Sequence, residues 1–261
     1  MAAVVEHSGE YPALPAVRRI TVSDLREALR KGIDDFREIP TQAVFLGLIY
    51  PIVGLFLWSV MVRYDVLPLL FPLVAGFALL GPFAAVGLYE LSRRRELGLD
   101  SDWHHAFDVL RSPARWSIFA LAVLLLVIFG AWLGVAHTIY VRTMGDTPLA
   151  SVFTFADKVL TTKPGWELIA IGNGVGFLFA VVTLMVSVVS FPLALDRKVD
   201  PATAIITSIR AVLVNPLPMM VWGFIVAVSL LAGSIPFLFG LAVVMPVLGH
   251  ATWHLYRRVV V

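Results

Sequence analysis

The feature that most constrains this chain is a set of long segments without a single aspartate, glutamate, lysine or arginine. They cover 42–62, 67–89, 116–139 and 217–256. A helix of about 20 apolar residues can cross a bilayer, and lipid offers the backbone no hydrogen-bond partners outside the helix itself. Only 15% of all residues are charged, whereas a soluble domain has about 25%. The sequence therefore predicts an all-α integral membrane protein.

We expect six transmembrane helices. The longest apolar run is divided at Gly233-Ser234-Ile235-Pro236, which suits a tight turn, because a single helix over that run would exceed a bilayer about 30 Å thick. The membrane domain covers 42–256, between a cytoplasmic N-terminal segment, 1–41, and a cytoplasmic tail, 257–261. The predicted spans are 42–62, 67–91, 116–139, 166–191, 217–234 and 236–256.

The distribution of lysine and arginine predicts the orientation. Positively charged loops stay in the cytoplasm. Sixteen of the 20 lysines and arginines lie in the two terminal segments and the two even-numbered connections. The four on the other side are Arg63, Arg142, Lys158 and Lys163. We therefore expect a bacterial inner-membrane protein with both termini in the cytoplasm.

Three cytoplasmic segments look alike. Each resembles an amphipathic helix that ends at a proline opening a span, and the first, 24–40, matches the third, 200–216, at a constant offset of 176. The second, 103–113, shares their ending. In the first segment, Leu25, Leu29, Ile33 and Phe36 form an apolar stripe expected in the membrane interface. The outer connection, 141–165, is also expected to hold a short surface helix.

The ends of the even-numbered spans also match. Pro82 and Pro246 are each followed eleven residues later by a pair of arginines, and this alignment pairs Tyr89 with Trp253. A shortened version follows Pro192. The sequence thus predicts six transmembrane helices arranged as three related helical hairpins, each preceded by a cytoplasmic amphipathic helix.

Several motifs resemble an uncharacterised bacterial family of integral membrane proteins. They are Ser190-Phe-Pro-Leu-Ala-Leu-Asp-Arg-Lys-Val-Asp200, Arg210-Ala211-Val212, Asn215-Pro216 and Pro246-Val-Leu-Gly-His-Ala-Thr-Trp-His-Leu-Tyr-Arg-Arg258. The family is a domain of unknown function, and some members are labelled as cytochrome c oxidase proteins. The resemblance runs from about residue 40 to the end and implies a membrane topology without any established chemistry.

The residues do not support a catalytic oxidase subunit. A haem needs axial ligands on opposite faces, but His137 and His250 lie at opposite ends of their spans, about a bilayer apart. Cysteine is absent, so no thiolate ligand exists. An accessory subunit beside an oxidase stays open, and we expect no cofactor in this chain.

Histidine is the residue type best suited to a site. His250 and His254 are four residues apart and share one helical face. His104 and His105 lie on a cytoplasmic segment and could approach them. Zinc accepts histidine and carboxylate ligands, so these four are candidate metal ligands. The alternative, which we favour, is that they are interfacial side chains and no metal binds.

Two basic clusters lie at the cytoplasmic ends of spans. Each positive charge near an anionic leaflet contributes about 1 kcal/mol to lipid binding. The candidate contacts for lipid head groups are Arg93, Arg94, Arg95, Arg257 and Arg258. Nucleic acid is not an expected partner, because the basic residues are spread along one face of the membrane.

The predicted function follows from what the spans lack. Ionisable residues inside spans are costly and usually functional, and here they are almost absent. We expect a non-enzymatic scaffold, assembly factor or accessory subunit of a membrane complex, including a respiratory one, with a membrane protein or a second copy as its partner. Two alternatives stay open. One is a transporter or facilitator for a small solute or lipid, and the other is a metal-dependent membrane enzyme with a cytoplasmic-face site.

Overall fold

The computed structural model describes residues 14–39, 69–145, 152–235 and 239–261. These residues form helices and connecting loops, together with one isolated β-bridge. The all-α prediction is therefore confirmed for the described part of the chain. The first predicted span, 42–62, lies outside the described residues.

Within the described part, four helical segments are long and apolar enough to cross a membrane. They are Phe71–Glu96, Arg115–Met144, Lys163–Arg197 and Pro216–Ser234. They correspond to the predicted spans 67–91, 116–139, 166–191 and 217–234, and each begins within a few residues of its prediction. The described structure thus supports four of the six predicted spans.

The sixth predicted span, 236–256, is not among these four segments. Residues 236–238 lie outside the described part, and α12 runs from Leu241 to Val259. The second half of α12 contains two histidines and two arginines, which lower its apolar character. This second half also packs against α1, Val22–Glu38, where Gly32 meets Ala251 and Asp35 meets His254.

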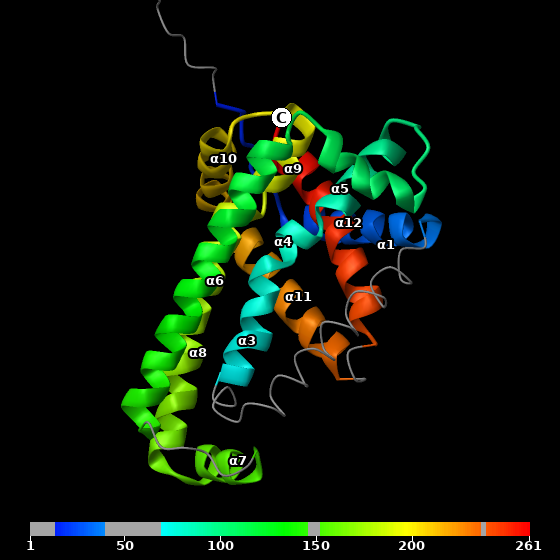
Figure 1. Ribbon diagram of the computed structural model, residues 1–261. Helices are drawn as coiled ribbons and strands as arrows, with labels where there is room; N and C mark the ends of the chain where they lie inside the picture. Colours follow the sequence, from blue (N-terminus) through cyan, green and yellow to red (C-terminus); the bar gives the residue numbers. More distant parts are fainter. Residues whose placement is uncertain (1–13, 40–68, 146–151, 236–238) are drawn as a thin grey trace, which may run out of the picture.

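Two long helices form the tallest part of the molecule. Figure 1 shows α6, Arg115–Met144, and α8, Lys163–Ser187, side by side. At their far end lies α7, Val152–Thr161, so the short helix predicted within 141–165 is confirmed. Helix α11, Pro216–Ser234, follows α10 and packs against α12.

The second predicted span is helical but interrupted. Its parts are α3 (Leu70–Phe77), the 3-10 turn η2 (Ala78–Leu80), α4 (Gly81–Ala84) and α5 (Val86–Glu96). Pro82 lacks an amide hydrogen and cannot donate to the carbonyl of Ala78, four residues earlier. The helix therefore tightens and bends at Ala78 before α5 restores regular geometry.

The three amphipathic segments are helical, as predicted. They are α1, the 3-10 helix η3 (Trp103–Arg111) and α10 (Pro201–Val214). Two of them pack on helices that precede them in the chain: η3 on α5, and α10 on α8 and α9 (Ser190–Arg197). The third, α1, packs instead on the last helix, α12. The buried positions Ala28, Gly32 and Asp35 of α1 recur at the predicted offset of 176 as Ala204, Ser208 and Ala211 of α10.

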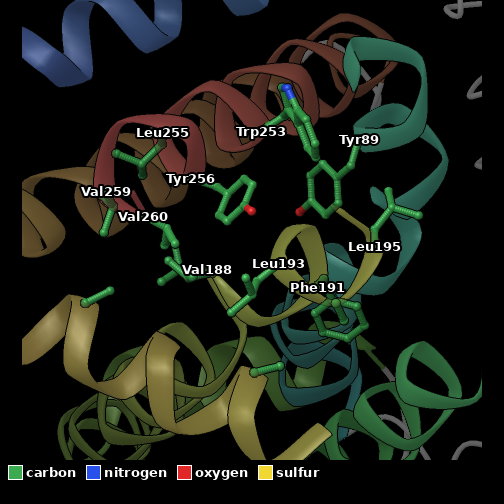
Figure 2. Close-up of a cluster of buried hydrophobic side chains, with 14 of the residues drawn as sticks. Tyr89, Val188, Phe191, Leu193, Leu195, Trp253, Leu255, Tyr256, Val259 and Val260 are labelled. Carbon is green, nitrogen blue, oxygen red and sulfur yellow. The ribbon is translucent and has the colours of Figure 1, made fainter. Parts of the chain in front are cut away.

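A dense core lies at one end of the molecule. Figure 2 shows Trp253 and Tyr256 of α12 facing Tyr89 of α5 and the side chains of Phe191 and Leu193 on α9. Tyr89 and Trp253, which the repeat alignment paired, are both almost completely buried. The Oη of Tyr256 donates to Asp196 at 2.6 Å, so its polar end is satisfied inside this core.

The described start and end of the chain meet at this same end. Val17 and Val260 form an antiparallel bridge, in which the amide of Arg18 donates to the Val259 carbonyl at 2.9 Å. The side chain of Asn215 binds the segment that leads into α1. Its Oδ1 accepts from the Ile20 amide at 2.8 Å, and its Nδ2 donates to the Arg18 carbonyl at 3.0 Å. We call this end, formed by residues 14–20, α1, η3, α9, α10 and the last turns of α12, the terminal face (Figure 1).

A glycine sets how closely α1 approaches α12. A Cβ placed on Gly32 would lie 2.6 Å from the Cβ and the backbone N of Ala251, which is closer than atoms can pack. Two of the α1 residues buried at this contact, Ala28 and Gly32, therefore have small side chains or none. Leu25 is buried beside them, against α12 and its neighbours. Leu25, predicted to lie in the membrane interface, is instead part of the protein core, while Ile33 is exposed.

The substitution Gly32→Ala should force the two helices apart and destabilise the fold by about 1–3 kcal/mol, as overpacking of a tight contact does. Chemical unfolding of the full chain in mixed micelles measures this loss. Gly130→Ala on α6 is the matched control, because nothing lies within 4 Å of its Cβ position. Equal stability of the two variants would contradict the close contact.

Candidate functional site

A buried polar cluster is built around Asp35. The face of α1 that carries Ala28 and Gly32 against α12 carries Asp35 one turn later, and this aspartate is only 4% exposed. A buried carboxylate is strongly destabilising unless it is paired and hydrogen-bonded. The position of Asp35 therefore requires donors from neighbouring helices.

Two neighbouring helices, α5 and α12, supply these donors. The Oγ of Ser92 on α5 donates to Asp35 Oδ2 at 2.6 Å, and Nε2 of His254 on α12 lies 2.8 Å from the same oxygen. Arg95, also on α5, forms a hydrogen-bonded ion pair with Oδ1. With His250, described next, these residues make up the Asp35 cluster.

His250 extends the cluster into the core. Its ring is completely buried, and its Nδ1 lies 2.7 Å from Ser92 Oγ. A serine hydroxyl has one proton, which Ser92 donates to Asp35, so Nδ1 of His250 must donate to Ser92. This requirement selects the tautomer with its proton on Nδ1.

The cluster keeps Asp35 ionised. Burial by itself would raise the pKa of Asp35, but the hydrogen bonds from His254 and Ser92 outweigh it, so the pKa of this carboxyl lies below its ordinary value. The resulting negative charge is balanced by Arg95. The cluster is therefore a charge-assisted clasp between α1, α5 and α12.

An open cleft with a volume of about 310 Å³ lies beside the cluster. Its lining holds three cations and three carboxylates among Arg30, Lys31, Asp34, Asp35, Ser92, Arg95, Glu96 and His254. The balance of charge gives it no strong preference for ions of one sign. Ser92 is almost fully buried and engaged by two partners, so it is not presented as a nucleophile.

The four predicted metal-ligand candidates fall into two groups. His250 and His254 both face Asp35. His105 on η3 instead lies 2.7 Å from Asp108 and 3.3 Å from Asp100, and His104 lies 3.1 Å from Asp102. In the described ranges, no group of three or more histidine, cysteine, aspartate or glutamate side chains is arranged to hold a metal ion.

A second polar contact fixes η3. Asp108 accepts from Arg94 Nη1 at 3.4 Å, and the buried Glu90 pairs with Arg93 at 2.8 Å. Asp108 stands five residues before the proline that ends its segment, as Asp35 does in α1. The two aspartates bind neighbouring arginines of α5, so the end of α5 holds two of the three amphipathic segments.

The five arginines predicted to contact lipid are all paired within the protein. Arg93 binds Glu90, Arg94 binds Asp108, Arg95 binds Asp35, Arg257 binds Glu96 and Asp196, and Arg258 binds Asp24. Each of these five arginines therefore has a carboxylate partner within the protein. Their contribution to lipid binding is correspondingly weakened, because their positive charges are already neutralised by neighbouring carboxylates.

Sequence reasoning missed the two central residues, Asp35 and Ser92. A signal for Asp35 was present, since it continues the row of Ala28 and Gly32 at helical spacing. Small residues in such a row indicate close helix packing, so this row could have been used to predict that the carboxylate is buried. Ser92 has no comparable signal inside its charged stretch.

Comparison with known proteins gives one finding. Residues 70–196 match a family described as predicted integral membrane protein, DUF2189. This match, which covers the elements from α3 to α9, confirms the resemblance to an integral membrane family of unknown function. No curated protein and no solved structure matches the chain.

Replacing Asp35 with asparagine should remove the buried counter-ion of Arg95, which would keep only the exposed Glu38 at 4.0 Å, and should weaken the hydrogen bonds from Ser92 and His254. We expect a loss of about 2 kcal/mol or more in the free energy of unfolding. Asp34→Asn is the matched control, since Asp34 is partly exposed and, among the described residues, its ion-pair partner is exposed Arg30 at 3.7 Å. It should cost less than about 0.5 kcal/mol, and similar losses in the two variants would refute the clasp.

The clasp also predicts a pH dependence. The pKa of Asp35 lies below its ordinary value of 3.8, so its ionised form stabilises the fold above about pH 4. That stabilisation is lost as the pH falls through the lowered value. The stability difference between the natural chain and Asp35→Asn should be constant near neutral pH and shrink below about pH 4, as measured by unfolding in detergent. A difference that grows in acid would have the wrong sign.

Proposed function

We propose that this chain is a non-enzymatic membrane protein that serves as a scaffold, assembly factor or accessory subunit, and that it binds a membrane-protein partner at its terminal face. The observation that carries the proposal is an apolar surface on the connection between α5 and α6. Its five large side chains are between 42% and 70% exposed: Leu97, Leu99, Trp103, Phe107 and Leu110. We call this surface the connection patch.

The connection patch lies outside the candidate spans, between Glu96 and Arg115. Soluble surfaces rarely expose contiguous apolar groups, and such patches usually mark interaction sites. The patch is also held in place. Val109 is buried beneath η3, Asp108 pairs with Arg94, and a Cβ on Gly87 would lie 3.0 Å from Ala106. The aromatic side chains are thus kept facing outward.

A protein fits the connection patch better than the anionic surface of a membrane. Asp100 and Asp102 lie among its apolar residues, and their side chains are 73% and 54% exposed. Carboxylates are repelled by anionic lipids. A partner with an apolar centre and basic residues at its rim would match both features.

The positions of the basic residues support a cytoplasmic terminal face. The terminal face holds the segments that carry most of the lysines and arginines, while α7 with Lys158 lies at the opposite end. The shared burial pattern of α1 and α10, and the packing of η3 and α10 on the helices that precede them, support three related hairpins and hence six spans.

The other two functions receive less support. A transporter needs a polar path between spans, whereas the cleft described above lies at the terminal face and is lined by α1, α5 and α12. An enzyme needs accessible reactive groups, whereas Ser92 and His250 are almost fully buried and the Ser92 hydroxyl is engaged by Asp35 and His250. The described spans α6 and α11 also carry no ionisable side chain between their ends except His137.

Purification of the tagged full chain in native lipid particles tests the proposal. A stoichiometric membrane-protein partner should co-purify with the natural chain. The double variant Phe107→Ser/Leu110→Ser should bind this partner with an affinity at least about tenfold lower. The matched control, Phe153→Ser/Leu160→Ser, removes an equally exposed pair from α7 and should keep the partner. A chain that always purifies alone would refute the scaffold.

A further inference from the structure

The outward face of α1 carries a row of arginines that the scaffold proposal does not use. Arg26, Arg30 and Arg37 are all exposed. Arg30 pairs with Glu27 at 2.7 Å. Among the contacts of the described residues, Arg26 and Arg37 have no ion-pair partner. These two are therefore uncommitted cations, unlike the paired arginines of α5 and α12.

The rotation of α1 about its axis is fixed. Successive residues of a helix are about 100° apart, which places Arg26, Arg30 and Arg37 in one row, roughly opposite Ala28 and Asp35. Because Gly32 and the Asp35 cluster hold that other side against α12, the arginine row must face away from the protein. Only a large displacement of α1 could turn it inward.

The residues on either side of this row differ in character. One edge is apolar, with Val22 49% and Ile33 39% exposed, and with Leu29 and Phe36 partly buried. The other edge is acidic, with Glu27, Asp34 and Glu38. Across the helix, the order is therefore apolar, basic and then acidic.

This order matches the layers of a membrane surface. Figure 1 shows α1 running crosswise to α6 and α8, so when those helices cross the bilayer α1 lies along its plane. The apolar edge would then meet the acyl boundary, the arginines would reach the phosphate level and the carboxylates would face water. A guanidinium also binds phosphate through two parallel hydrogen bonds.

We propose that α1 is a docking surface for anionic phospholipids, in which Arg26 and Arg37 bind the phosphate groups and Val22 and Ile33 contact the acyl chains. An acidic protein is the rival occupant. An acidic protein would bind the arginines, but it would leave the exposed side chains of Val22 and Ile33 without an apolar contact. The proposal does not depend on the connection patch, which lies on a different segment of the terminal face.

Binding of phosphatidylglycerol to the delipidated full chain in non-ionic detergent tests this proposal, with native mass spectrometry as the readout. Each of the variants Arg26→Gln and Arg37→Gln should weaken binding roughly fivefold. Lys31→Gln is the matched control, because Lys31 is exposed on the same helix but lines the cleft on its other side. It should leave the affinity nearly unchanged at physiological salt, where charges are screened beyond about 8 Å.

Three further measurements decide between the sources of binding. Phosphatidylcholine and glycerol phosphate should bind far more weakly than phosphatidylglycerol, and Arg26→Lys/Arg37→Lys should keep most of the affinity. Equal loss in Lys31→Gln would reduce the effect to general charge and overturn the proposal. Unchanged lipid affinity in Arg26→Gln/Arg37→Gln would also overturn the proposal. If that variant then lost a protein partner, the occupant of the α1 surface would be an acidic protein. Unfolding in detergent confirms that the variants remain folded.

Discussion

The buried carboxylate of Asp35 is the constraint on which the terminal face depends. An isolated charge in this position would cost several kcal/mol, and the donors that offset the cost come from α5 and α12. The first described helix is thereby bound to the last one. The bridge between Val17 and Val260 and the side chain of Asn215 strengthen the same closure, so the ends of the chain act as one structural unit.

The uneven packing of the molecule has a simple physical origin. Lipid tails are as apolar as leucine, so the hydrophobic effect does not drive helices together inside a bilayer. Large side chains such as Phe177 on α8 and Phe224 on α11 are accordingly widely exposed. At the terminal face, which the proposed topology places outside the bilayer, removing apolar side chains from water stabilises the fold. There Phe191, Trp253 and Tyr256 are almost completely enclosed.

The positive charges at this end have two different roles. Those of Arg94 and Arg95 fix the amphipathic segments by binding Asp108 and Asp35, while those of Arg26 and Arg37 remain available on the outside of α1. A count of lysines and arginines treats both kinds alike. Only their distances to carboxylates separate the arginines that hold the fold together from those that can contact lipid.

The sequence by itself predicted most of the helices of the described residues. The lengths of the apolar runs predicted α6, α8 and α11, and helical spacing with a closing proline predicted α1 and α10, because these signals are local. It also predicted that His250 and His254 share a face. It did not predict the burial of Asp35, the internal pairing of Arg95 or the covering of α12. Asp35 and His254 are 219 residues apart, and their meeting depends on the rotation of α1 against Ala251. That rotation follows from the shapes of two distant surfaces, so only the tertiary structure could decide it.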